Sequence, residues 1–309
     1  MQLLRSLSDL PLDTSGSAVT IGFFDGVHLG HQTLLRRTVE VASEEGLTSV
    51  AVTFDRHPRE VLTPGKEPRL LTTTERKADL IAALGIEVML VIEFTQAFAD
   101  VSADDFVAQV LTDGLRARHT VVGANFTFGH RAMGNPDTLA EIGADAGFTA
   151  ETLPLLDLDG KRVSSSSIRE AVAEGDLAWP ELALGRRFAV GGEVVTGHGR
   201  GHGLGYPTAN LQTWPRLLLP GRGIYAGRGI VTGGAHVAAI DVGTNPTFGT
   251  EPLHIESFLL DFDGDLRGQH MDVEFWARLR DEVKFDSEDE LVRQIADDVE
   301  RTRAIVPPA

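Results

Sequence analysis

Residues 18–35 read AVTIGFFDGVHLGHQTLL and predict a strand, a tight turn and a helix. The run 18–24 has the length of one buried strand, Asp25-Gly26 is a turn signal, and good helix formers follow from Gly30. Unpaired N–H groups and the positive dipole end at a helix N-terminus attract phosphate, and a glycine there lets the anion approach the backbone. The stretch therefore predicts an anion site at a strand-to-helix turn.

Two imidazoles, His28 and His31, lie at this turn, three residues apart. Imidazoles beside a phosphate site can donate hydrogen bonds to phosphate oxygens and titrate near neutral pH. Such a pair suits an enzyme that stabilises charge on an α-phosphate. Two alternatives stay open, a pair of ordinary turn histidines and a pair of zinc ligands, although no cysteine or further ligand completes a tetrahedral zinc set.

The composition is that of a soluble globular protein with two domains. The chain has 309 residues, of which 42% are hydrophobic and 24% charged. The absence of cysteine excludes disulfides and thiolate metal sites. No run approaches the roughly 18 apolar residues of a membrane span, and Arg5 and Asp9 interrupt the segment where a signal peptide needs an apolar core. We expect a cytoplasmic protein.

The net charge of −17 limits the partners that the surface can attract. So acidic a surface repels nucleic acid and anionic membranes at long range, and we expect neither as a partner. Small anions such as ATP are compatible with it, because a few local cations and N–H groups can outweigh the distant field. The sequence leaves open whether the protein forms a homo-oligomer.

Apolar runs and amphipathic stretches alternate through the first half of the chain. Strands are predicted at 49–54, 87–92 and 120–123, with helices at 74–84 and 103–111. This alternation predicts a parallel sheet covered by helices on both faces, with ligands at the carboxyl ends of its strands. The turn lacks the Gly-x-Gly-x-x-Gly of a dinucleotide site, which disfavours a simple NAD dehydrogenase.

Two further loops should reach the same edge of the sheet. Residues 123–129 read GANFTFG, in which Asn125 could bind a base or flavin edge while Phe126 or Phe128 packs on a ring. The alternative is a glycine-rich turn with core phenylalanines.

The second loop, residues 161–170, reads KRVSSSSIRE. Ser167 and Glu170 fit a capping box, so a helix should start here, and the helical pattern should stop near Trp179-Pro180. Four hydroxyls and three cations around a helix start predict a triphosphate clamp, with a plain helix cap as the alternative.

These motifs together resemble the adenylyltransferase half of the prokaryotic bifunctional riboflavin kinase/FAD synthetases (FMN adenylyltransferases). The resemblance rests on FDGVHLGH at 24–31, the Asn125 loop and SSSSIR at 164–169. Phe23 departs from the asparagine common in the family, and Ser166 departs from Ser-Ser-Thr but keeps the hydroxyl.

The resemblance implies an α/β nucleotidyltransferase-like domain with a Rossmann-type parallel sheet over residues 1–183. In it, His28 and His31 would hold the α-phosphate region and stabilise the transition state. The residues that would bind ATP or FMN are Gly22, Phe24, Asn125, Arg162, Ser165, Ser166 and Arg169.

The second half of the chain has the composition of a small barrel. Fourteen of the 33 glycines lie between Gly185 and Gly234, which suits short strands with tight turns. A hairpin turn is expected at Asp263-Gly264 and a closing helix over 287–303. The strands predicted for this antiparallel barrel are 188–195, 223–231, 237–242, 255–262 and 271–275.

Residues 196–211 read TGHGRGHGLGYPTANL and carry the chemistry of this half. Glycines at nearly every second place, among them Gly199, Gly201 and Gly205, allow backbone N–H groups to wrap a phosphate chain. Thr208 and Asn210 alternate on one side of an extended segment, so their oxygens could face one Mg²⁺. A flexible linker is the alternative.

Glu256 is a carboxylate within a largely apolar predicted strand. Such a position could hold a general base for a primary hydroxyl group. The alternative is an ordinary residue on the solvent face of the strand.

The second half resembles the riboflavin kinase module of the same family. The matching segments are GYPTAN at 205–210, GIYAG at 223–227, GTNPTFG at 243–249, Glu256 with LLDF at 259–262, and residues 278–285. The resemblance implies a kinase domain over 184–309 in which Thr208 and Asn210 place Mg²⁺-ATP. Glu256 would take the proton from the ribityl 5′-hydroxyl.

The two modules together imply that ATP phosphorylates riboflavin to FMN, and that a second ATP adenylylates FMN to FAD and pyrophosphate. Two rival interpretations stay open. Another nucleotidyltransferase, with a cytidylyl donor or a pantetheine acceptor, leaves the barrel unexplained. A flavin-binding sensor without catalysis conflicts with the presence of Glu256, Thr208 and both turn histidines.

Overall fold

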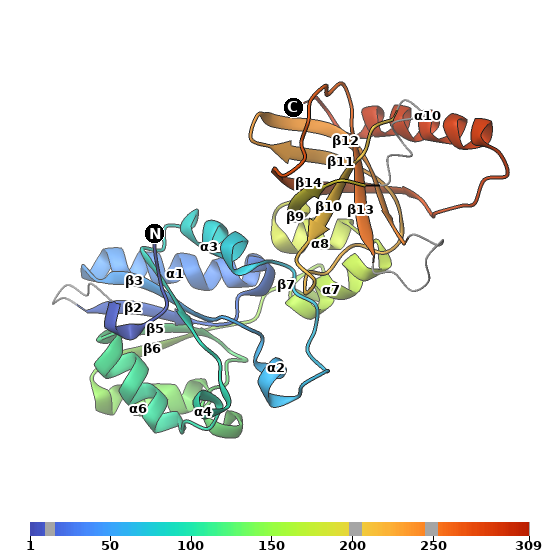
Figure 1. The fold of residues 1–309 in the computed structure, drawn as a ribbon. Helices are drawn as coiled ribbons and strands as arrows, with labels where there is room; N and C mark the ends of the chain where they lie inside the picture. Colours follow the sequence, from blue (N-terminus) through green and yellow to red (C-terminus); the bar gives the residue numbers. More distant parts are fainter. Residues whose placement is uncertain (10–15, 198–205, 245–252, 309) are drawn as a thin grey trace. The chain divides into compact units, whose positions relative to one another are not determined.

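The computed structural model describes residues 1–9, 16–197, 206–244 and 253–308. The chain forms two compact units, Met1–Ser165 and Ser166–Ala309, which are coloured from blue to green and from green to red in Figure 1. This division after Ser165 reflects only how compactly the residues pack. It does not test the predicted boundary between the functional domains at 183/184.

The first unit contains the predicted parallel sheet, with six strands in the order β1-β4-β3-β2-β5-β6. The chain builds β2, β3 and β4 outward on one side and then returns to place β5 beside β2. The switch point of the sheet therefore lies between the carboxyl ends of β2 and β5, where open α/β sheets bind ligands. The strands are β1 (Gln2–Leu4), β2 (Ser17–Ile21), β3 (Thr48–Phe54), β4 (Val88–Ile92), β5 (Ala117–Gly123) and β6 (Thr149–Leu153).

Helices cover both faces of this sheet, as expected (Figure 1). On one face, side chains of α1 (Leu29–Glu45) and α3 (Thr74–Ala82) pack with Ala51 and Met89. On the other face, α5, the π-helix η3 and α6 pack against the valines of β3. Successive strand residues point to opposite faces of the sheet, so the side chains of a fully apolar strand pack into a hydrophobic core on each face. The other helices are α2 (Pro58–Leu62), α4 (Gln96–Ala99), α5 (Ala103–Phe106), η3 (Val107–Gly114), α6 (Pro136–Ala146) and three short 3-10 helices, η1 (Leu7–Asp9), η2 (Asp25–Val27) and η4 (His130–Ala132).

The second unit begins with helices and closes into the predicted antiparallel barrel, with strands in the order β10-β13-β12-β11-β14-β9. The helix α10 (Glu288–Ile305) packs on β11, β12 and β14. Its N-cap is Ser287, whose hydroxyl accepts from the N–H of Glu290 at 3.3 Å. The strands are β9 (Phe188–Val195), β10 (Ala209–Thr213), β11 (Gly223–Val231), β12 (Gly234–Gly243), β13 (His254–Leu259) and β14 (His270–Arg280).

The expected hairpin at Asp263-Gly264 is wrong, because β13 and β14 do not pair. Instead β13 pairs with β10 and β12, while β14 pairs with β9 and β11. The connection between them carries the chain past two strands of the closed barrel, so the local Asp-Gly signal marks a bend and not a two-residue turn.

The start and end expected for the helix after the serine run are also wrong. The helix α7 (Ser165–Glu174) already contains Ser167, so this residue cannot be its N-cap. The hydroxyl of Ser167 instead accepts from the indole Nε1–H of Trp179 at 3.3 Å. Pro180 lies in the first turn of a separate helix, α8 (Ala178–Leu184), where its missing N–H costs nothing.

Candidate active sites

The turn after β2 has an unusual backbone conformation. Phe24, Gly26 and Val27 all have positive φ, at 52°, 78° and 43°, in a region that non-glycine residues seldom adopt. The carboxylate of the buried Asp25 accepts from the N–H groups of Leu71, at 2.9 Å, and Thr72, at 3.1 Å. These bonds from the segment before α3 hold the strained turn in place.

His28 is the N-cap of α1. Its Nδ1 accepts from the backbone N–H of His31 at 3.2 Å, and the two rings stack with centroids 3.5 Å apart. A ring that accepts at Nδ1 carries its proton on Nε2 when neutral. A Cβ on Gly30 would lie 3.3 Å from the His28 ring, so glycine fits this close approach. The arrangement places an imidazole N–H donor at the N-terminus of a long helix.

The Asn125 loop leaves the strand beside this turn. Because β5 pairs with β2, the His28 turn and Asn125 both follow the carboxyl ends at the switch point. Asn125 is exposed there, but Phe128 is buried in the core and stacks on Phe126 with centroids 5.4 Å apart. Phe128 is therefore a core residue, whereas Phe126 is half-buried beside it, and packing of either ring on a ligand stays a prediction.

Of the other residues predicted for this site, Phe24 is a core residue and only 1% exposed. Gly22 donates its N–H to the carbonyl of Val52 at 3.0 Å, which continues the sheet toward the turn. Ser165 ties the serine segment to the turn, since its hydroxyl donates to the carbonyl of Asp25 at 2.9 Å. Arg162 is exposed and pairs with Asp157, and this hydrogen bond lowers the pKa of the Asp157 carboxyl.

Ser166 and Arg169 lie three residues apart in α7, so they share a side of the helix with one turn between them. Ser166 is exposed and Arg169 is half-buried. A hydroxyl and a guanidinium spaced in this way can contact neighbouring phosphate oxygens.

Sequence reasoning missed a buried lysine near the first turn. Lys77 of α3 is 2% exposed, donates to the hydroxyl of Thr53 at 3.2 Å and lies over the ring of Phe23 at 4.2 Å. Burial lowers the pKa of Lys77 to about 8. The sequence feature that could have indicated this burial is the position of Lys77 on the apolar face of the helix, beside Ala78 and one turn before Ile81.

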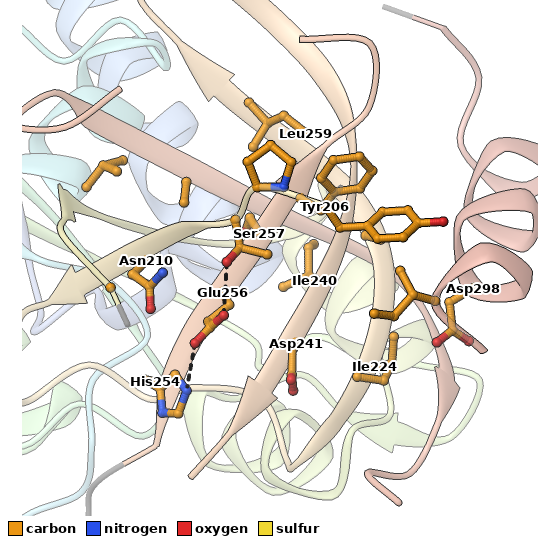
Figure 2. Close-up of a pocket in the computed structure, with 18 of the residues that line it drawn as sticks. Tyr206, Asn210, Ile224, Ile240, Asp241, His254, Glu256, Ser257, Leu259 and Asp298 are labelled. Carbon is orange, nitrogen blue, oxygen red and sulfur yellow. Dashed lines mark hydrogen bonds and ion pairs between the residues drawn. The ribbon is translucent and has the colours of Figure 1, made fainter. Parts of the chain in front are cut away.

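The barrel contains a cavity of about 610 Å³, lined by strand residues and by α10 (Figure 2). One row of cross-strand neighbours crosses its wall. In this row Asn210 lies opposite Glu256, Glu256 opposite Asp241, Asp241 opposite Ile224, and Ile224 opposite Arg280. Such neighbours share a face and have Cβ atoms about 5 Å apart. The closed sheet therefore gathers residues from five strands into one row, four of whose five side chains are polar or charged.

Two side chains hold Glu256 in this cavity, as Figure 2 shows for the labelled carboxylate. The hydroxyl of Thr208 donates to its Oε2 at 3.0 Å, and Nε2 of His254 lies 3.5 Å from its Oε1. The hydrogen bond with Glu256 raises the pKa of the His254 imidazole. The glutamate is thus a cavity residue and not an ordinary solvent-face residue.

The structure brings Thr208, Asn210 and Glu256 together in the cavity wall, and their roles in a kinase site stay predictions. Gly199, Gly201 and most of the glycine-rich loop, including Gly205, lie outside the described residues, so their predicted contacts stay predictions.

Both halves of the chain match known protein families. Residues 10–167 match the FAD synthetase family and residues 184–306 match the riboflavin kinase family. A bifunctional riboflavin kinase/FMN adenylyltransferase of Pseudomonas fluorescens is 39% identical over 100% of this chain and 99% of its own. The enzyme of that name from Escherichia coli K12 is 34% identical over 96% of both chains.

The chain belongs to the bifunctional riboflavin kinase/FMN adenylyltransferase family. Its N-terminal part is a FAD synthetase domain and its C-terminal part a riboflavin kinase domain. A solved structure from Streptococcus pneumoniae, described as a macrolide-efflux protein, has a TM-score of 0.88 and 30% identity over 98% of each chain. In the described part of this chain, no helix is long and apolar enough to cross a membrane.

Sequence reasoning also missed Asp241 in the kinase domain. Burial, together with the carboxylates of Glu282 and Glu256, raises the pKa of Asp241 to about 7. Its Oδ1 is buried and has no hydrogen-bond partner in the described parts of the chain. The only local feature that could have drawn attention to Asp241 is that it is an acidic residue in the otherwise apolar run 237–242. The strand register that sets it beside Glu256 cannot be predicted from the sequence of either strand alone.

Proposed function

We propose that riboflavin is phosphorylated in the barrel cavity of the domain 184–309, and that FMN is adenylylated at the His28 turn of the domain 1–183. The observation that carries the kinase assignment is the contact of Thr208 with Glu256, beside Asn210. It sets a base next to two neutral oxygen ligands, which is the combination that phosphoryl transfer to a hydroxyl group requires.

In the kinase step, Glu256 takes the proton of the ribityl 5′-hydroxyl while that oxygen attacks the γ-phosphorus of ATP. A new P–O bond forms to the 5′-oxygen, the bond from the γ-phosphorus to the β,γ-bridging oxygen breaks, and ADP leaves. The hydrogen bond from Thr208 and the contact with His254 orient the carboxylate for this transfer.

The side chains of Thr208 and Asn210 fit Mg²⁺, because hydroxyl and amide oxygens are hard ligands and the rest of the coordination shell can come from phosphates and water. Thr208 uses its proton toward Glu256, which leaves its oxygen lone pairs for a cation. When bound, Mg²⁺ would neutralise charge on the transferred phosphate.

In the adenylyl transfer step, a phosphate oxygen of FMN attacks the α-phosphorus of ATP, the bond to the α,β-bridging oxygen breaks and pyrophosphate leaves. The Nε2–H of His28 and the N–H groups at the start of α1 would stabilise the charge that develops on the α-phosphate, with His31 supporting the ring by stacking. Neither step needs a covalent intermediate, since positioning and charge neutralisation suffice.

The remaining contacts of this site are proposed from the sequence motifs. Asn125 would bind a base or flavin edge, and Ser165, Ser166 and Arg169 would bind phosphate oxygens. Arg162 would exchange Asp157 for a phosphate when nucleotide binds. Phe24 is buried, so it and Gly22 would contact nucleotide through their backbone.

Product analysis tests the proposal. Purified full-length protein with riboflavin, ATP and Mg²⁺ should yield FMN and FAD on a chromatogram. Glu256→Gln should abolish FMN formation and keep conversion of added FMN to FAD, and His28→Ala with His31→Ala should do the reverse. Glu193→Gln, an exposed glutamate of β9, is the control and should keep both activities.

Three results would reject the proposal. Absence of both products would do so, and so would binding of flavin without turnover, which is the behaviour of a sensor. A requirement for CTP in place of ATP would point to a different nucleotidyltransferase.

A further inference from the structure

Asp241 occupies a defined position relative to the proposed kinase residues. The register of β10, β13 and β12 sets Asn210, Glu256 and Asp241 in one line, with Glu256 in the middle. Figure 2 shows the same order. If phosphate lies at Asn210 and the reacting hydroxyl at Glu256, the next position along the line faces the remainder of the acceptor molecule.

The spacing of this line suits a polyol chain. Neighbouring strands are about 4.8 Å apart. Two hydroxyl oxygens on alternate carbons are joined by four bonds of about 1.5 Å, which at tetrahedral angles span about that distance. A hydroxyl group one or two carbons from the phosphorylated one therefore comes within reach of Asp241 while the terminal hydroxyl lies at Glu256.

The surroundings of Asp241 leave it able to bind such a group. Its side chain lines the cavity, yet its Oδ1 has no hydrogen-bond partner among the described residues. The charged groups that face it are Glu256 and His254 of β13, Arg280 of β14 and Glu282. Arg280 is already engaged with Asp298. A buried polar atom without a hydrogen-bond partner lowers the stability of the folded chain, so a ligand that donates a hydrogen bond to it would bind favourably.

We propose that Asp241 binds a hydroxyl group of the ribityl chain of riboflavin next to the one that is phosphorylated. This inference rests on the proposed role of Glu256. A carboxyl group can accept from a hydroxyl whether it is ionised or protonated, so the contact does not depend on its charge. Asp241 thereby distinguishes acceptors by their side chain and leaves the flavin ring to other parts of the cavity.

The test compares two ligands that differ only in this side chain. Riboflavin carries the ribityl chain, whereas lumiflavin carries a methyl group in its place and cannot be phosphorylated. In assays of the full chain with ATP and Mg²⁺, the KM for riboflavin and the inhibition constant of lumiflavin are measured for the natural protein and for Asp241→Ala. Loss of one hydrogen bond predicts an increase of about 10-fold in the KM for riboflavin, with less than a 2-fold change for lumiflavin.

Two further variants keep the test decisive. Asp241→Val suits a buried strand position and gives the same comparison if Asp241→Ala fails to fold. Asp272→Ala, a half-buried aspartate of β14 outside the cavity, is the matched control and should change neither constant. Asp241→Asn keeps an accepting oxygen and should raise the KM for riboflavin less than Asp241→Ala does.

The outcomes separate this inference from the proposed function. An equal effect of Asp241→Ala on both ligands, no effect on either, or a changed Mg²⁺ requirement alone would overturn the role of Asp241 while the kinase assignment stands. Failure of the natural protein to phosphorylate riboflavin would overturn both.

Discussion

The imidazole of His28 accepts a hydrogen bond at Nδ1 from the backbone N–H of His31, 3.2 Å away. This single bond gives His28 two separable roles. Its Nδ1 satisfies one of the unpaired N–H groups at the start of α1, while Nε2 carries the proton of the neutral ring. A substitution can therefore keep one role and remove the other.

His28→Asn should keep the helix cap and lose catalysis, because asparagine accepts through Oδ1 at the position of Nδ1 but has no group at the position of Nε2. We expect the rate of FAD formation from FMN to fall by about 10² to 10³-fold. His28→Ala should lose in addition about 1 kcal/mol of stability with the cap. Chromatography of FAD and urea unfolding check these outcomes, and riboflavin phosphorylation is the internal control. FAD synthesis at the natural rate in His28→Asn would contradict the role of Nε2.

Thr208→Val should damage the kinase without disturbing the barrel, because valine has the shape of threonine and lacks the oxygen that contacts Glu256. We expect a fall of about 10²-fold in riboflavin phosphorylation and a higher Mg²⁺ requirement. Thr208→Ser should restore most of the rate, and Thr213→Val at the other end of β10 should have little effect. Equal rates in the valine and serine variants would argue against a role for the hydroxyl.

Much of this arrangement could be predicted from the sequence, and the reason differs between the two halves. The predicted bounds of β9 and β11 coincide with the structure, because each is a largely apolar run with glycine-containing segments on both sides. Parallel strands have their carboxyl ends at one edge of the sheet, so the His28 turn and Asn125 were expected at that edge.

What the sequence could not supply is the pairing of distant strands. The Asp263-Gly264 signal is local, whereas β13 pairs with β10 across more than forty residues, and only that pairing sets Asn210 beside Glu256. The same register brings Asp241 next to Glu256. Lys77 was missed for a related reason, since its partners Thr53 and Phe23 come from two different strand ends.

Asp241 should make stability fall as pH rises. Its pKa is about 7 in the folded chain, against 3.8 for the ordinary carboxyl, so between these values the folded state holds a proton that the unfolded state has lost. Stability then decreases from about pH 4 to pH 7 and is constant above, because the slope follows the difference in bound protons. Asp241→Asn should be more stable than the natural protein at pH 8, by at most roughly 4 kcal/mol, with a smaller difference at pH 5. Unfolding curves at the two pH values check this, and a difference that grows toward low pH would contradict it.

Lys77 should have the opposite pH dependence. Its pKa is about 8 in the folded chain against 10.5 ordinarily, so between these values the unfolded state binds the extra proton and stability rises with pH. Lys77→Met removes this rise. The stability of the variant relative to the natural protein should therefore be greatest below pH 8 and decline toward pH 10. Thermal melts from pH 7 to pH 10, with Lys66→Met as an exposed control, measure the trend.

Removing one partner of the ion pair between Arg280 and Asp298 should cost far more stability than removing one partner of an exposed pair on the same helix. Asp298 of α10 is 3% exposed and accepts from Arg280 Nε, at 3.0 and 3.1 Å, and from Nη2 at 2.7 Å. Asp298→Ala leaves a guanidinium in a partly buried site without its partner, which should cost about 3 to 5 kcal/mol. Riboflavin phosphorylation should fall with it, because Arg280 and α10 line the kinase cavity.

The control for that ion pair comes from the same helix. Arg303 pairs with the exposed Asp261, and a solvent-exposed pair contributes little to stability because water and salt screen it. Arg303→Ala should therefore unfold at nearly the urea concentration of the natural protein and phosphorylate riboflavin normally. Equal losses in Asp298→Ala and Arg303→Ala would show that burial does not set the value of these pairs. A double variant, Arg280→Met with Asp298→Leu, should recover most of the stability lost by Asp298→Ala, because it removes the unpaired charge and not only its partner.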